Sequence, residues 1–309
     1  MTQLLQPLVT VVGPTGAGKS DLAIAIAQAF RGEIINCDSL QIFRYFEIGT
    51  AKIPLSERCG IAHHMIDVIS PDALMTAGEY AKLAREMLKD VTKRGKLPIV
   101  CGGTGFYLRA LLEGLSPSPE RDQALRQRLM KCRDPHRLLL RLDPEAANRI
   151  DAPDVNKVIR ALEIRILSGK PALELMGGKR DALEGYRILK LGLNPPRLLL
   201  NERIKQRSKN MFAGGLLDEV RSILAMGYPE TAKPFEAIGY KESLQSLRGE
   251  ISAAQAQELT ETHTRQYAKR QLTWFRRDKE IHWLEEFGQS PAAIEQTLQR
   301  VRDFSPFSE

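Results

Sequence analysis

Residues 8–20 read LVTVVGPTGAGKS, and this stretch decides the fold. Its first five residues form a β-branched run that is typical of a strand buried on both faces. The next eight, GPTGAGKS, match the pattern G-x-x-x-x-G-K-[ST], which chance produces in roughly one chain in a hundred of this length. Residues 22–30 then show helical spacing. Because a phosphate-binding loop joins a strand to a helix, this order predicts such a loop, or P-loop, at residues 13–20.

The residue types of this loop suit the binding of phosphate. Glycines let the backbone wrap closely around phosphate oxygens, and successive N–H groups at the start of a helix supply positive potential. Lys19 adds a point charge, and the Ser20 hydroxyl is a ligand for Mg²⁺. The residues expected to hold the phosphates are Gly13, Pro14, Thr15, Gly16, Ala17, Gly18, Lys19 and Ser20. The loop alone does not identify the phosphate compound, and a nucleotide such as ATP is the usual one.

Strands and helices alternate beyond the loop. Strand-like runs cover residues 33–38, 64–69 and 97–101. A helix is expected from Thr76, whose spacing to Glu79 is that of a capping box, to residue 94. Another is expected after the glycine-rich residues 102–105, through residue 112. This alternation predicts an α/β fold with a parallel sheet and helices on both sides.

The pattern changes at residues 116–119, SPSP. From there to about residue 177 only helical segments are found, and strand character returns at 186–193. We therefore expect residues 1–116 to form the first part of a P-loop α/β core. Residues 117–185 are expected to form an all-helical insertion domain, and residues 186–309 to complete the core and add C-terminal helices.

Composition excludes several classes of protein. No apolar run approaches the ~18 residues that a membrane span needs. The N-terminus lacks the pattern of a signal peptide. The four cysteines are scattered, without a CxxC pair, which excludes a disulfide scaffold and favours a reducing, cytoplasmic location. The net charge of +7 makes a polyanionic partner plausible.

Asp38 is the acid expected nearest the loop. An enzyme that transfers phosphate from ATP should carry an acid at the end of a second strand, but residues 97–101 are followed by Gly102 and Gly103. Asp38 follows the strand at 33–38, at the edge where parallel sheets place their sites. Its carboxylate is suited to bind Mg²⁺ through water or to act as a general base, and the alternative is an Asx turn that ends the strand.

Eight motifs, in order along nearly the whole chain, resemble the bacterial type of the tRNA dimethylallyltransferases (tRNA isopentenyltransferases). They are GPTGAGKS at 13–20, DSLQ at 38–41, IGTAK at 48–52, GGTGFY at 102–107, LLEGL at 111–115, RALE at 160–163, IGY at 238–240 and RQYAKRQLTW at 265–274. Eukaryotic relatives carry a C-terminal zinc finger, and here no cysteine follows Cys132.

The resemblance implies that the loop binds the diphosphate of dimethylallyl diphosphate, with Mg²⁺ at Ser20. The acceptor would be the exocyclic N6 amine of adenine 37 in tRNAs that read codons beginning with U. Asp38 would be the general base, and Thr15 and Arg207 would assist at the diphosphate. The family fold has a helical insertion that clasps the anticodon stem-loop, and we expect a monomer.

The resemblance also assigns tRNA contacts to individual residues. They are Asp38, Ser39, Leu40, Gln41, Thr104, Arg126, Asn156, Lys157, Val158, Ile159, Arg160, Glu236, Ala237, Ile238, Gly239, Tyr240 and Lys241. Basic segments agree with an RNA partner, since residues 121–160 hold ten Lys and Arg against six acids.

Two other functions remain open on the sequence. One is a small-molecule or nucleotide kinase that uses ATP, with Arg126, Arg128 or Arg133 on a helical lid. The other is an RNA-binding protein whose loop has lost its catalytic role. Neither gives a reason for the motifs at 38–41 and 238–240.

Overall fold

The structure is a computed structural model that describes residues 5–304. The chain forms two compact units, one made of residues up to Leu111 and from Leu183 onward, and the other of Leu112–Ala182. The expected insertion, 117–185, therefore begins earlier than the SPSP segment indicates. Two contacts tie residues 112–116 to the second unit. Arg180 forms an ion pair with Glu113, and Ser116 Oγ donates a hydrogen bond to the carbonyl of Met176 over 2.7 Å.

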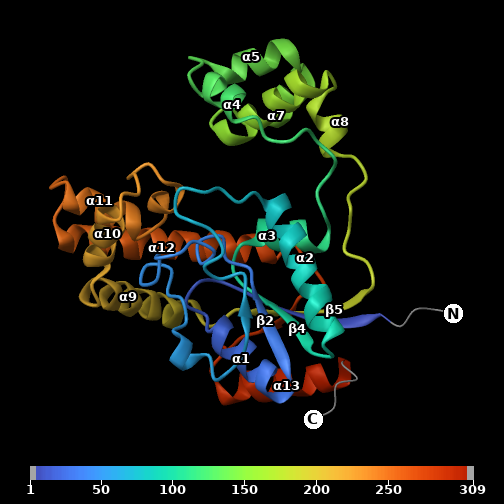
Figure 1. Cartoon of the computed structure of the whole chain (residues 1–309), viewed down its shortest axis with the longest axis vertical. Helices are drawn as coiled ribbons and strands as arrows, with labels where there is room; N and C mark the ends of the chain where they lie inside the picture. The colour runs from blue at the N-terminus through green and yellow to red at the C-terminus, as the bar shows by residue number, and fades with distance from the viewer. Residues whose placement is uncertain (1–4, 305–309) are drawn as a thin grey trace. The chain divides into compact units, whose positions relative to one another are not determined.

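The first unit contains a six-stranded sheet whose order is β3-β2-β4-β1-β5-β6 and whose paired strands are all parallel. Figure 1 labels β2, β4 and β5 of this sheet. The strands are β1 (Gln6–Val12), β2 (Gly32–Asn36), β3 (His63–His64), β4 (Leu97–Cys101), β5 (Tyr186–Leu193) and β6 (His282–Leu284). The strand expected at 64–69 is wrong in length, because Met65 and Asp67 adopt positive φ angles of 61° and 57° that end it. The parallel sheet confirms the predicted fold class.

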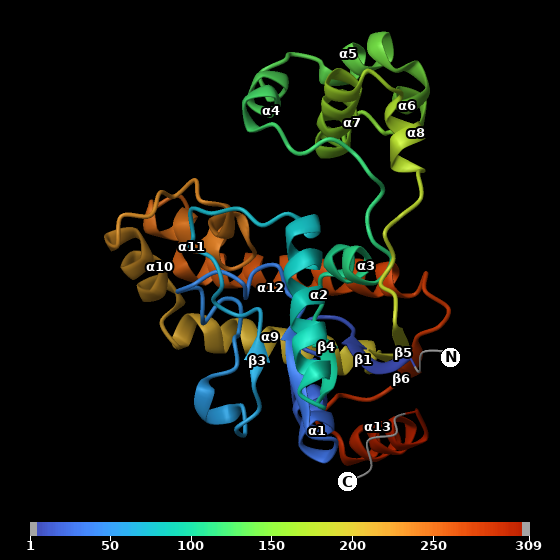
Figure 2. The same ribbon diagram turned by 45° about the vertical axis from the view of Figure 1, so that its right-hand side comes forward.

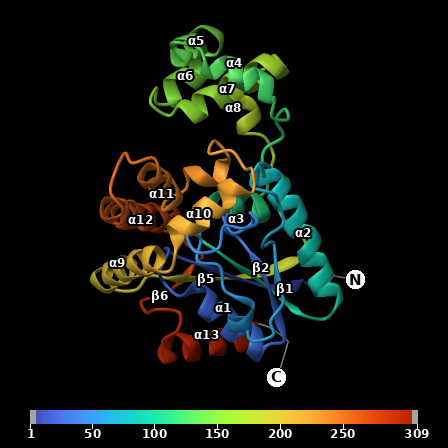
Figure 3. The same cartoon turned by 60° about the vertical axis from the view of Figure 1, so that its left-hand side comes forward.

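Helices cover both faces of this sheet. Helices α1 (Lys19–Ala29) and α13 (Pro291–Phe304) pack on one face, where Val9, Leu22 and Val301 belong to a single buried cluster. Helix α2 (Ala77–Lys93) lies on the opposite face (Figure 3), and the predicted capping box of Thr76 and Glu79 is present at its start. The helices on both faces hold the strands in place, and the strands in turn position the loops at their carboxyl ends.

The remaining elements of this unit are mainly helical. They are η1 (Leu55–Glu57), α3 (Gly105–Leu112), α9 (Arg197–Ala213), α10 (Leu216–Ala225), η2 (Lys233–Glu236), α11 (Tyr240–Leu247) and α12 (Ala253–Phe275). Helices α9 and α10 are separated at Gly215, which adopts a φ of 94° and caps the start of α10. Helix α12 begins with a capping box formed by Ser252 and Gln255.

The second unit consists of helices in its described elements (Figure 2). They are α4 (Gln123–Met130), α5 (Pro135–Leu142), α6 (Pro144–Arg149), α7 (Val155–Ser168) and α8 (Ala172–Met176). Aspartates cap four of them, because each carboxylate accepts a backbone N–H of the first turn: Asp122, Asp134, Asp143 and Asp154. Leu139, Val158 and Leu162 lie in its core. Across residues 5–304, no helix is both long enough and apolar enough to cross a membrane.

Candidate functional site

The candidate site lies at the carboxyl ends of β1, β4 and β2, which are neighbours in the sheet. The P-loop follows β1, Gly102 follows β4, and Asp38 follows β2 after one residue. Backbone hydrogen bonds join these segments: Gly102 N–H donates to Val11 O over 3.1 Å, and Thr104 N–H donates to Cys37 O over 3.1 Å. Open parallel sheets bind ligands at this edge, where the strand order changes direction.

The P-loop has the backbone geometry of an anion cradle. Gly13, Gly16 and Gly18 have φ angles of 143°, 82° and 84°, which side chains other than glycine adopt only with strain. At Gly13 a Cβ would also lie 2.8 Å from Leu193 O. Gly18 caps α1 and has no side chain with which to satisfy the first N–H groups of the helix. Those donors and the helix dipole therefore favour an anion at this end of α1.

Two cations and one carboxylate share the site. Lys19 begins α1 and donates to Pro14 O over 2.8 Å. Burial lowers the pKa of Lys19 to about 8; the Asp38 charge opposes this shift, and Arg207 adds to it. Burial also lowers the pKa of Arg207, which comes from α9, and the Asp38 carboxylate again opposes the shift. Two desolvated cations beside one carboxylate leave excess positive charge, which a bound diphosphate would neutralise.

The Asp38 side chain forms the Asx turn, and its carboxylate also lies within electrostatic range of other groups of the site. The Leu40 N–H donates to Asp38 Oδ1 over 2.9 Å. Burial raises the pKa values of the Tyr107 and Tyr267 phenols, and the Asp38 charge raises both further. The carboxylate is half-buried, so the turn and a chemical role are compatible.

The other residues expected around Asp38 are brought together. Thr104 Oγ1 accepts the Ser39 N–H over 3.0 Å, and Gln41 Nε2 donates to Thr50 O over 3.1 Å. Ser39, Leu40, Gln41 and Thr104 are all half-buried at the same sheet edge.

Residues 236–241 divide into exposed and buried members. Glu236 and Lys241 are exposed, and Ala237 and Ile238 are half-buried, but Gly239 and Tyr240 are buried. The Tyr240 hydroxyl donates to Glu219 Oε1 over 2.6 Å and accepts the Gly49 N–H over 3.0 Å. The Tyr240 side chain therefore fixes residues 47–50 against α10 and α11, and the RNA contact expected at this position stays a prediction.

In the second unit, the expected RNA contacts are partly core residues. Val158 and Ile159 are fully buried, so their side chains belong to the core, and the RNA contacts expected at these positions stay a prediction. The buried Glu163 carboxylate accepts Arg126 Nη1 over 3.1 Å and Arg160 Nη1 over 2.6 Å. Arg126 is only 8% exposed, and its position there is structural. Asn156 and Lys157 are exposed at the start of α7.

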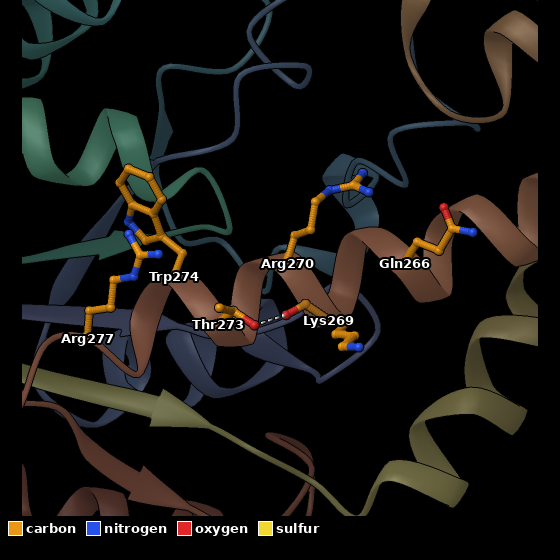
Figure 4. Close-up of a pocket in the computed structure, with 6 residues that line it drawn as sticks. All are labelled: Gln266, Lys269, Arg270, Thr273, Trp274 and Arg277. Carbon is orange, nitrogen blue, oxygen red and sulfur yellow. Dashed lines mark hydrogen bonds between the residues drawn. The ribbon is translucent and has the colours of Figure 1, made fainter. Parts of the chain in front are cut away.

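Helix α12 contains the motif at 265–274, and the structure gives roles to side chains of that motif to which the sequence assigned none. Gln271 is buried and joins the P-loop to the turn after β4 through hydrogen bonds to Thr15 and Gly103. The same helix borders a surface pocket of about 400 Å³ (Figure 4), lined by Gln266, Lys269, Arg270, Thr273, Trp274 and Arg277. Three of these six side chains are basic, and only the fold shows that they line one pocket.

A cation at this site would need the substrate as a ligand. Within the described residues, no group of three or more His, Cys, Asp or Glu side chains is placed to hold a metal ion. Mg²⁺ usually binds through one or two protein oxygens together with substrate phosphates. The half-buried Ser20 hydroxyl, on the first turn of α1 beside Lys19, fits that kind of site.

The comparisons with known proteins agree with this arrangement. The IPP transferase family matches residues 41–278. The chain is 54% identical over 303 residues to a tRNA dimethylallyltransferase of Solibacter usitatus, covering 96% of this chain and 99% of that protein. It is 46% identical to a tRNA dimethylallyltransferase of Koribacter versatilis, covering 96% and 98%.

This chain also matches solved structures of tRNA-modifying transferases. A tRNA isopentenylpyrophosphate transferase from Bacillus halodurans matches with a TM-score of 0.73 and 32% identity, over 96% of both chains. A eukaryotic dimethylallyltransferase, in a structure described as acting on tRNA, matches with a TM-score of 0.82 and 27% identity, over 96% of this chain and 79% of that one. From its sequence and its fold, this chain belongs to the IPP transferase family.

Proposed function

We propose that this chain transfers a dimethylallyl group from dimethylallyl diphosphate to the N6 amine of adenine 37 in tRNAs that read codons beginning with U. The products are N6-dimethylallyladenosine and diphosphate. One observation carries the proposal: in a member of this family, Lys19 and Arg207 lie within electrostatic range of Asp38 beside an anion cradle. A binding site for the diphosphate leaving group and a proton acceptor thereby lie at one sheet edge.

The cations account for the departure of the diphosphate. An aromatic amine is a weak nucleophile, so the donor must approach an allylic cation while negative charge develops on the leaving group. Lys19, Arg207 and the N–H groups at the start of α1 are suited to stabilise that charge, and partial burial strengthens their effect. Mg²⁺, held by Ser20 and the diphosphate, would add further positive charge there.

Asp38 accounts for the proton. As the C–N bond forms and the C–O bond to diphosphate breaks, the amine must lose one proton. The Asp38 carboxylate is the proposed acceptor, and general-base help of this kind is worth about 10²–10⁴ in rate. The adenine has to leave its stack to reach Asp38, which costs a few kcal/mol and least in a single-stranded loop.

The RNA would meet surfaces of α12 and of the second unit. The α12 pocket presents Lys269, Arg270 and Arg277 beside Trp274, a combination suited to phosphates and to a stacked base (Figure 4). Asn156 and Lys157 are the proposed contacts from α7 because they are exposed.

The kinase alternative has less support. The turn after β4 offers Gly102 and Gly103 where an acid would be needed. Arg126, one of the arginines that a kinase lid would use, is buried against Glu163. The lack of an acid at this turn also suits prenyl transfer, since activation of water there would waste the donor by hydrolysis.

The test is to incubate the protein with unmodified tRNA and radiolabelled dimethylallyl diphosphate, with and without Mg²⁺, and to locate the label by nuclease digestion. We expect Mg²⁺-dependent label on adenine 37. Tight Mg²⁺-dependent ATP binding with a phosphorylated product, and no transfer from the allyl donor, would favour the kinase. Binding of tRNA without reaction with any allyl donor would favour an RNA-binding protein.

A further inference from the structure

Gln271 joins two loops of the site with one side-chain amide. Its Oε1 accepts the Thr15 N–H over 2.8 Å, and its Nε2 donates to Gly103 O over 2.9 Å. The side chain is 5% exposed. A Cβ on Gly103 would overlap Gln271 Nε2, so the turn after β4 lies directly against the amide. One neutral group therefore fixes the P-loop relative to the neighbouring strand.

Helix α12 gives this amide a fixed base. One turn before Gln271, Ala268 packs with Leu200 and Ile204 of α9. One turn after it, Trp274 lies so close to Gly105 that a Cβ there would overlap the indole. Because both neighbouring turns are packed, the Gln271 side chain reaches Thr15 from a rigid helix.

The P-loop needs such an anchor because glycine makes it flexible. Gly13, Gly16 and Gly18 adopt positive φ angles. Glycine adopts negative φ angles about as readily, so its own backbone preference does not hold the loop in this conformation. A loop that is free to move must be ordered when it binds an anion, which weakens binding. The bond from Thr15 also occupies one N–H of the loop, so the phosphates are left to the donors nearer the start of α1.

We propose that Gln271 is a positioning residue that holds Thr15, and with it the P-loop, in the anion-binding conformation before the diphosphate arrives. The proposal rests on the proposed function only for the identity of the donor. Gln271 itself does not touch the reacting atoms in this assignment.

The test compares Gln271→Met with Gln257→Met. Methionine keeps the length of the side chain but provides neither hydrogen bond, and Gln257 is a half-buried glutamine of the same helix that lies outside the pocket lining. Calorimetric titration with inorganic pyrophosphate and Mg²⁺, without RNA, should show about tenfold weaker binding for the Gln271 variant, about 1.4 kcal/mol. Binding by the Gln257 variant should equal that of the unchanged protein. Equal affinity in all three proteins would overturn the proposal.

Kinetics separate positioning from a general loss of structure. In transfer assays the KM for the allyl donor should rise about tenfold in the Gln271 variant, while the KM for tRNA stays within about twofold. An equal rise in both KM values, or no rise in either, would count against positioning of the diphosphate loop.

Amide hydrogen exchange on the unchanged protein decides the matter if the variant does not fold. The Thr15 amide should be protected without any ligand and should stay protected when pyrophosphate binds. Exchange at the rate of an exposed amide would refute the role of Gln271. If the unchanged protein fails to bind pyrophosphate, the proposed function fails, but this exchange measurement still judges Gln271.

Discussion

Replacing Asp38 with asparagine tests the proposed general base with little change in structure. Asparagine keeps an oxygen that can accept the Leu40 N–H, which now bonds to Asp38 Oδ1 over 2.9 Å, so the turn after β2 is retained. The variant lacks only the charge and the proton-accepting oxygen. General-base catalysis contributes about 10²–10⁴ in rate, so kcat should fall by that factor, about 3–5 kcal/mol in activation free energy.

The assay should be run at pH 7 because the substitution also affects Lys19. The Asp38 charge opposes the lowering of the Lys19 pKa, so without it that pKa falls below its present value of about 8. Single-turnover transfer to tRNA isolates the chemical step, and filter binding reports tRNA affinity, which should change by no more than about twofold. Asp21→Asn is the matched control, because Asp21 is an exposed carboxylate on the first turn of α1.

Turnover by the Asp38→Asn variant within a few-fold of the unchanged protein would refute the general-base assignment. A large loss of tRNA affinity with an unchanged single-turnover rate would instead place Asp38 in binding alone. If the Asp21→Asn variant lost as much activity as Asp38→Asn, any change of charge near the P-loop would be enough to lower the rate.

Three further predictions concern the cation, the insertion and the buried tyrosine. Burial lowers the pKa of Lys19 to about 8, so its cation is present below pH 8 and is lost above it; pyrophosphate affinity should fall as the pH rises through 8, and the part of that slope due to the lysine should vanish in Lys19→Met. Glu163→Ala strands the buried Arg126 and should destabilise the helical insertion by about 3–5 kcal/mol in urea denaturation, whereas Glu145→Ala, at an exposed ion pair, should cost less than about 1 kcal/mol; similar losses would contradict the account. Tyr240→Phe removes two hydrogen bonds and should cost about 1–3 kcal/mol in the same assay with no change in donor KM, and a stability equal to that of the unchanged protein would show that the hydroxyl is not structural.

The parts of the fold that the sequence predicted depend on local patterns. The P-loop lies between a buried strand and a helix because glycine spacing, β-branching and helical periodicity act over a few residues. The caps at Thr76 and Ser252 were predictable for the same reason, since each involves a partner three residues away. The short β6 was not predicted, because three residues give too little alternation.

The side chains of the site were harder to assign because a motif does not tell which members face outward. Val155 is 46% exposed, whereas Val158 and Ile159 are fully buried, and all three are β-branched apolar residues of α7. Gln271 shows the second limit. Its partner Thr15 is 256 positions away in the chain, and no local pattern in the sequence contains that contact.

The central claim is that the P-loop binds the diphosphate of an allyl donor whose five-carbon tail points toward Asp38. A crystal structure with tRNA and a non-reactive thio analogue of dimethylallyl diphosphate tests it most directly. The account predicts the diphosphate against residues 13–20, and the tail between that loop and Asp38 beside an extruded adenine. A tail lodged elsewhere, or an adenine that remains stacked away from Asp38, would contradict it.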